Sequence, residues 1–274
     1  MGGVFPLAGD DAVINLTAAG AVTLNSSLAN TVHSVTTNAN TSLSLGNDNL
    51  TLVSTSTIGG GLTQSGGTLT GAGNLTVSGQ ITWTGGTMSG TGVTNANGGL
   101  AIGLLGVYDQ MFLTQRTLNS NYGLYLASGA TLDNTFGSTF KILDNASINA
   151  NGGAPAGGTF ANEGTLSKTG GVGTSYLSDG ITLNNTGVIQ AASGVLNLQG
   201  AFSNFSTATN TLTGGSYVVS ATLQFTNANI VTNAAAISLI GTASKIIDNG
   251  SLDALRGFAT NTAAGAFTIQ GGRT

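Results

Sequence analysis

A short unit of two glycines, alternating threonine and aliphatic residues, and further glycines recurs along this chain. The segment 66–73 reads GGTLTGAG and returns at 85–92 as GGTMSGTG. A second unit, NEGTL at 162–166, returns at 185–189 as NTGVI. A period of about 20 residues, built from strand-like pieces and glycine turns, indicates a solenoid, in which each repeat buries its apolar face only against its neighbours.

The residues between the glycines have the alternation of β-strands. NLTVS at 74–78 and QITWT at 80–84 place aliphatic and polar side chains on opposite faces. Hairpin sandwiches show no such repeat, so we expect an all-β fold consisting of one right-handed parallel β-helix. At about 20–24 residues per rung, residues 1–274 hold on the order of 12 rungs. No shift in composition divides the chain, so we expect residues 1–274 to form one β-solenoid domain.

Two segments interrupt the pattern. The stretch 108–125 is rich in bulky residues, and SLDALRGF at 251–258 contains a candidate helical turn over 253–258. Ser251 is placed to cap the start of that turn, and Gly257 to end it. Each segment is interpreted as a protrusion from the coil or as a wider rung.

The composition excludes several classes of partner. Charged residues make up 6% of the chain, the formal net charge is −4, and the six lysines and arginines are scattered. A nucleic-acid surface needs clustered cations, so we expect no nucleic-acid partner. No apolar run approaches the ~20 residues that cross a bilayer, so we expect no membrane insertion. With no cysteine there is neither a disulfide framework nor a thiolate metal site.

Asparagines at repeated turn positions suggest a ladder. Asn162 and Asn185 occupy the same place in the second unit, and Asn204 follows at a similar interval. Stacked amides can donate to one rung and accept from the next, as in cross-β structures. Alternatively, these asparagines only adopt the left-handed conformation of a tight turn, and the two interpretations are compatible.

Catalytic and metal-binding chemistry has little support in the residues. The adjacent acids Asp10 and Asp11 point to opposite faces of a strand, and we interpret them as edge and turn residues. His33 is the only histidine, which excludes a His-based metal cluster. We therefore expect no catalytic residues, no metal ligands and no cofactor.

Aromatic residues are the candidates for surface contact. Tyr108, Tyr122 and Tyr125 form the stretch that we expect to contact a glycan or another protein. Trp83 joins them if its side chain faces outward, where its ring would suit a sugar. It shares its strand parity with Ile81, which favours the interior instead.

Several stretches resemble one class of proteins. They are 6–35, which contains GDDAVI and TVHSV, the glycine-threonine unit at 66–92, the Asn-x-Gly rungs at 160–170 and 183–200, and 254–272. These resemble the repetitive bacterial surface proteins of the autotransporter-passenger and filamentous-haemagglutinin-like class. The resemblance implies a parallel β-helix, export to the bacterial cell surface, and an adhesive or scaffolding role.

We therefore expect a non-enzymatic extracellular stalk or adhesin shaft, with glycans or other surface proteins as partners. The alternatives are a polysaccharide lyase or hydrolase and a self-assembling filament subunit. The start of the chain, MGGVFP, has no export signal, and the end, FTIQGGRT, follows a strand without a polar cap. These features predict a fragment of a longer repetitive protein, or end-to-end self-association.

Overall fold

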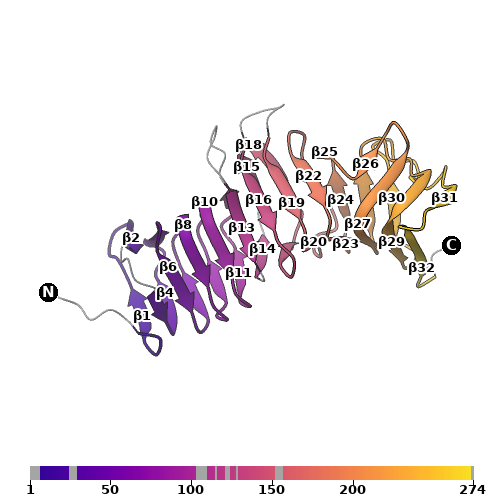
Figure 1. The fold of residues 1–274 in the computed structure, drawn as a ribbon. Coiled ribbons are helices and arrows are strands. Elements are labelled where there is room, and N and C mark those ends of the chain that lie inside the picture. The colour runs from indigo at the N-terminus through magenta and orange to yellow at the C-terminus, as the bar shows by residue number, and fades with distance from the viewer. Residues whose placement is uncertain are drawn as a thin grey trace.

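The computed structural model is an elongated parallel β-solenoid, as the repeat predicts. It describes residues 7–24, 30–102, 110–114, 116–120, 124–127, 129–151 and 157–272. Successive strands lie side by side along one axis, and the first and last strands lie at opposite ends (Figure 1). Three ladders of strands run along this axis, and the chain visits them in turn on each rung as far as β25 (Ala201–Phe202).

The first ladder is the longest and consists entirely of parallel pairs. Beside it, β32 (Ala266–Gln270) also pairs with β29, and the short β26 (Phe205–Ser206) pairs with β27 in the antiparallel sense. In chain order, the ladder comprises β1 (Asp11–Ile14), β4 (Ser34–Thr37), β7 (Ser56–Ile58), β9 (Leu75–Val77), β11 (Val93–Ala96), β14 (Thr117–Ser120), β17 (Thr139–Ile142), β20 (Thr165–Lys168), β23 (Val188–Ala191), β27 (Thr211–Val219), β29 (Thr232–Ile240) and β31 (Thr260–Asn261).

The second and third ladders share two long strands, β8 (Leu62–Thr70) and β10 (Ile81–Ser89). The remaining strands of the second ladder are β2 (Gly20–Leu24), β5 (Thr41–Leu45), β12 (Leu100–Ile102), β15 (Leu124–Ala127), β18 (Ile148–Asn151), β21 (Thr174–Leu177), β24 (Val195–Leu198), β28 (Thr222–Phe225) and β30 (Lys245–Ile247). Those of the third are β3 (Asn30–Val32), β6 (Asn49–Leu52), β13 (Gln110–Thr114), β16 (Thr131–Asn134), β19 (Thr159–Asn162), β22 (Thr182–Asn185) and β25 (Ala201–Phe202).

The repeated glycine pairs form the corner between these two ladders. Gly67 and Gly86 have φ values of 55° and 80°, which bend β8 and β10 in the middle. The spacing between the two copies of the glycine unit also sets the strand register, since Thr68 pairs with Thr87 and Leu69 with Met88. The sequence period is therefore the length of one turn of the coil.

The coil makes about nine turns, fewer than the 12 rungs expected from the repeat length. The two numbers differ because the ladders have unequal lengths. The first ladder stacks twelve strands, whereas the third ends at β25. Beyond that point β27 and β29 are long, with nine residues each, and belong to the first ladder.

Aliphatic side chains from all three ladders fill the interior. Leu43, Leu50 and Ile58 come from consecutive strands and are buried. Aromatic rings fill wider rungs, as where Phe140 and Phe160 meet edge to face with centroids 5.3 Å apart. Most internal strands bury every second residue, so their other side chains form the surface.

The predicted helical turn at 253–258 is wrong, because the described residues contain no helix. The segment forms a non-helical turn in which the Arg256 amide donates to the Asp253 carbonyl. Ser251 has a φ of 65° and does not cap it. The Asp253 carboxylate instead accepts from the Leu255 amide, an Asx turn that competes with helix formation.

Candidate functional site

The aromatic residues expected to form a contact patch are not brought together in the described residues. Tyr108 and Tyr122 lie outside the described residues. Tyr125 lies on β15 with its side chain 47% exposed. Trp83 is fully buried on β10, and its indole N–H donates to the Gly85 carbonyl at 3.0 Å. Trp83 therefore belongs to the interior and cannot contact a glycan at the surface.

The asparagines form a buried row of hydrogen-bonded side chains, the asparagine ladder, at the corner between the third and first ladders of strands. Asn162 Nδ2 donates to Asn185 Oδ1 at 2.6 Å, and Asn134 Nδ2 donates to Asn162 Oδ1 at the same distance. Asn204 binds the main chain of Asn185 instead, donating to its carbonyl and accepting from its amide. Asn134 was not identified from sequence, because its rung does not continue with the Asn-x-Gly pattern.

Two buried cations, also missed from sequence, bind main-chain carbonyls. Arg116 is fully buried and donates to the carbonyls of Gly71, Gly73 and Ser89 and to the Thr94 hydroxyl, at 2.7–3.2 Å. Burial lowers the pKa of its guanidinium to about 10, so it stays charged at neutral pH.

Lys168 is also buried, and its ammonium donates to the carbonyls of Asp144 and Gly170 at 2.6 and 2.7 Å. Burial lowers the pKa of Lys168, and the nearby charge of Asp144 opposes this shift. Both cations join neighbouring rungs, so their role is structural.

The acids near the N-terminus supply hydrogen bonds at turns and edges. Asp10 accepts from the Leu7 amide at 2.8 Å. Asp11 accepts from the Ser34 hydroxyl at 2.6 Å and lies 2.7 Å from His33 Nδ1. The bonds from Ser34 and His33 lower the pKa of the Asp11 carboxyl. Within the described residues, no group of three or more His, Cys, Asp or Glu side chains could hold a metal ion.

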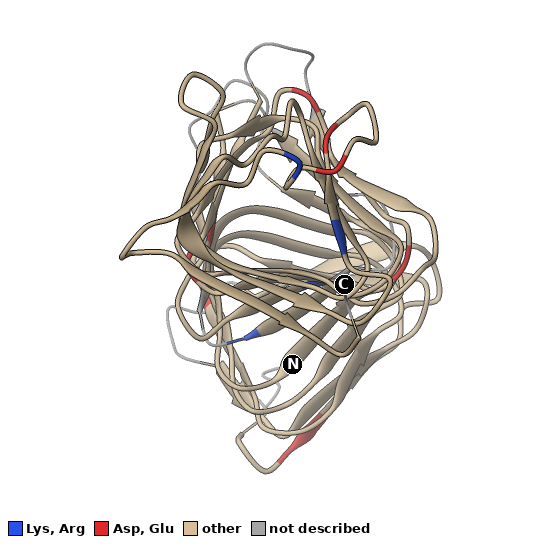
Figure 2. Cartoon of the chain, turned by 90° about the vertical axis from the view of Figure 1, so that its right-hand side faces the viewer, with Lys and Arg blue, Asp and Glu red and all other residues tan. Residues whose placement is uncertain are grey.

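Charged residues are few and scattered along the described chain (Figure 2). One pair of acids does interact across neighbouring rungs, Asp133 on β16 and Glu163 after β19. Burial and then the charge of Glu163 raise the pKa of the Asp133 carboxyl. Glu163 also lines a surface groove.

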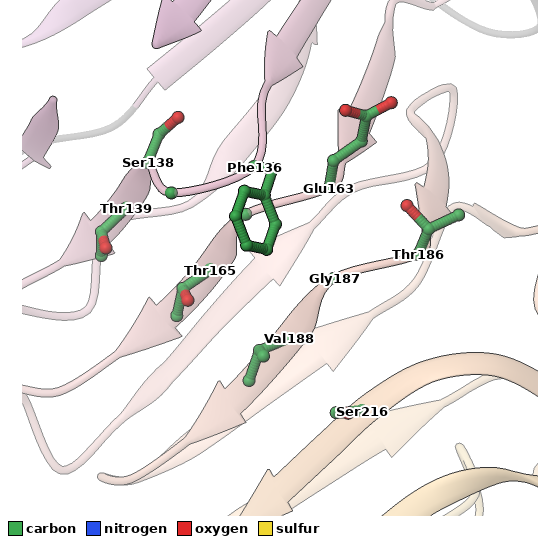
Figure 3. Close-up of a pocket in the computed structure, with 11 residues that line it drawn as sticks. Phe136, Ser138, Thr139, Glu163, Thr165, Thr186, Gly187, Val188 and Ser216 are labelled. Carbon is green, nitrogen blue, oxygen red and sulfur yellow. The ribbon is translucent and has the colours of Figure 1, made fainter. Parts of the chain in front are cut away.

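That groove has a volume of about 390 Å³ and crosses the corner where the asparagine ladder lies inside. An exposed aromatic ring, that of Phe136, stands over it with 85% of the residue exposed. The ring lies between the Glu163 side chain and a row of side chains from the first ladder (Figure 3). The residues that line it are Phe136, Gly137, Ser138, Thr139, Glu163, Gly164, Thr165, Thr186, Gly187, Val188 and Ser216.

A second groove, of about 310 Å³, lies where the third ladder ends at β25. Its walls are the rings of Phe202, Phe205 and Phe225, which contact one another edge to face at centroid distances of 5.1–5.4 Å. These rings are continuous with the interior cluster of the coil. The groove is therefore a gap beside the core, at the end of the third ladder, rather than a separate site.

The geometry assigns this chain to one known structural class, the parallel β-solenoid, and to nothing more specific. No helix in the described part of the chain is long and apolar enough to cross a membrane. Comparison with protein-family models, curated proteins and solved structures finds no match to this chain.

Proposed function

We propose that this chain is a non-enzymatic structural solenoid, the stalk or adhesive shaft of an extracellular bacterial surface protein. The resemblance of its glycine-threonine and Asn-x-Gly rungs to autotransporter passengers and filamentous haemagglutinin supports this assignment. A shaft of this kind extends away from the cell and presents neutral side chains along its length. Its partners are glycans or other surface proteins, contacted through many weak hydrogen bonds.

The continuous first ladder is the observation that carries the proposal. Its twelve strands pair in parallel from β1 to β31, so eleven intervals of ~4.8 Å give a rod about 53 Å long. Main-chain bonds fix each rung to the next, and asparagine amides and two buried cations reinforce some of these junctions. Such a stack resists local opening, because every internal rung is held on both sides.

The outer surface fits a role in the extracellular space. Charged residues are 6% of the chain, and the outward strand positions carry mainly threonine, serine and asparagine. These groups bind water and sugars without the salt-dependent attraction that charged surfaces show. The chain also contains no cysteine, so an oxidising environment forms no disulfide bonds in it.

Surface labelling in the source organism tests the proposal. An antibody against residues 157–272 is expected to label intact cells, and a deletion strain serves as the control. Labelling only after permeabilisation would contradict the extracellular assignment.

A second measurement separates the shaft from an enzyme. The purified chain is incubated with a panel of neutral and acidic polysaccharides, and new reducing ends and unsaturated ends are measured. We expect no turnover, together with persistent β-structure by circular dichroism after prolonged protease treatment. Turnover of any polysaccharide would favour the lyase or hydrolase, and concentration-dependent lengthening in light scattering would favour a filament subunit.

A further inference from the structure

The groove beneath Phe136 arises from two additional residues in one corner of the coil. Asn134 pairs with Asn162, and Thr139 pairs with Thr165, on consecutive rungs. In the earlier rung, four residues lie between Asn134 and Thr139. In the later rung, only Glu163 and Gly164 lie between Asn162 and Thr165. The longer corner therefore projects outward beyond its neighbour.

This projecting corner is held rigidly. The Ser138 amide donates to the Thr135 carbonyl at 3.0 Å, and Gly137 has a φ of 84°, the geometry of a type II turn. The hydroxyls of Thr135 and Ser138 both donate to the Leu113 carbonyl of the preceding rung, at 2.8 and 2.6 Å. A single exposed apolar residue is ordinary in proteins. Phe136 differs because the turn fixes its ring above a groove.

Glycines at the next two corners, Gly164 and Gly187, line the groove without side chains. A Cβ on Gly164 would collide with the carbonyls of Thr135 and Ser138, and one on Gly187 with the carbonyl of Gly164. These glycines are therefore required by the stacking of the rungs. Their consequence at the surface is a floor of bare main chain beside the Phe136 ring (Figure 3).

One wall of the groove is a row with one side chain per rung. Thr139, Thr165, Val188 and Ser216 are paired in sequence along the first ladder. Three of the four carry hydroxyls, and neighbours in the row are one strand spacing apart, ~4.8 Å. A pyranose ring has a similar length, so consecutive sugar units can each meet one rung.

The chemistry of the walls selects a class of ligand. The strands under the row are hydrogen-bonded on both sides, so they offer no free edge to an extended peptide. Glu163, with Asp133 nearby, makes the groove unfavourable for phosphates, sulfates and uronates. A carboxylate accepts strong hydrogen bonds from sugar hydroxyls, and an aromatic face suits the C–H groups of a pyranose.

We propose that the groove under Phe136 binds an uncharged pyranose glycan along the solenoid axis. Phe136 is the stacking platform, Glu163 accepts from sugar hydroxyls, and the hydroxyls of Thr139, Thr165 and Ser216 bind successive units. This inference deepens the adhesive part of the proposed function and rests on it.

A glycan array of neutral and acidic oligosaccharides tests the site, with the purified chain as the probe. We expect binding to at least one neutral glycan and weaker binding to uronate-containing ones. Calorimetry with the best neutral oligosaccharide then compares variants. Phe136→Ala is expected to weaken binding by at least about tenfold, a loss of about 1.4 kcal/mol. Phe136→Trp retains the aromatic face and should retain binding.

Two further variants make the result specific. Tyr176→Ala removes another exposed aromatic, from β21 of the second ladder, and is expected to leave the affinity unchanged. Glu163→Gln should narrow the difference in affinity between neutral and acidic glycans. No binding to any neutral glycan, or equal binding by Phe136→Ala and the unmodified chain, would overturn the site. If the rod remains intact and is surface-labelled in that case, the shaft proposal stands and only the glycan site is lost.

Discussion

The asparagine ladder allows a quantitative test of what holds the rungs in register. Asn162 is buried at the corner and makes three side-chain hydrogen bonds. Its Nδ2 donates to Asn185 Oδ1 at 2.6 Å and to the Val188 carbonyl at 3.0 Å, while its Oδ1 accepts from Asn134. Asn162→Ala removes all three bonds and leaves the Asn185 oxygen without the amide that donates to it.

The expected loss follows from these contacts. An intramolecular hydrogen bond contributes about 1 kcal/mol net, so three bonds give a decrease of about 3 kcal/mol in the free energy of unfolding. Asn184→Ala is the matched control, because it makes the same chemical change at an exposed position of the neighbouring rung. A surface substitution of that kind should stay within about 0.5 kcal/mol.

Urea unfolding followed by circular dichroism measures both variants at equal protein concentration. Because rungs of a solenoid can unfold separately, amide hydrogen exchange is measured alongside, with the effect expected in β19 to β23. A double-mutant cycle with Asn185→Ala should show coupling of about 0.5–3 kcal/mol. If Asn162→Ala and Asn184→Ala destabilise equally, the ladder contributes nothing beyond strand pairing, and the reasoning fails.

Three further predictions concern the interior and one surface acid. Arg116→Met should lower the urea midpoint, because the carbonyls of Gly73 and Ser89 lose the guanidinium that donates to them, at about 1–3 kcal/mol for each carbonyl left unsatisfied; an unchanged midpoint would show that water replaces the guanidinium. Trp83→Ala should lower the free energy of unfolding by about 3–5 kcal/mol in the same assay, whereas truncation of a tryptophan on the surface would lower it little. The pKa of Asp133 is raised by folding, so its ionisation opposes folding as pH increases through its unfolded value. Asp133→Asn should therefore raise thermal stability at pH 7 and lose this advantage at pH 3, and a gain that is independent of pH would contradict that cause.

Much of the fold could be predicted because the period of the sequence repeat equals the number of residues between paired positions on neighbouring strands. The spacing between the copies of each repeated unit equals the spacing between paired strands, both for the glycine-threonine unit and for the Asn-x-Gly unit. The parity argument for Trp83 holds for the same reason, since Ile81 and Trp83 on one strand both face the interior. Local pattern and global packing agree at these positions.

The features that were missed depend on contacts between rungs that no local pattern records. Arg116 is buried because carbonyls of two earlier rungs converge on it, and nothing in its own neighbourhood distinguishes it from an exposed arginine. The turn at 253–258 has helical composition, but the Asp253 side chain binds the main chain in a competing turn. Phe136 did leave a signal: its corner is two residues longer than the corner at Glu163.

The lengthened corner at Phe136 shows that residues can be added at the surface of this solenoid without changing how its rungs stack. Pairing resumes at Thr139 as though Phe136 and Gly137 were absent, so rungs on either side are indifferent to what is placed between them. The same position should therefore accept a spliced epitope or recognition peptide as a cassette. Natural variants of such a coil could acquire new specificities one corner at a time, while the rest of the coil stays as it is.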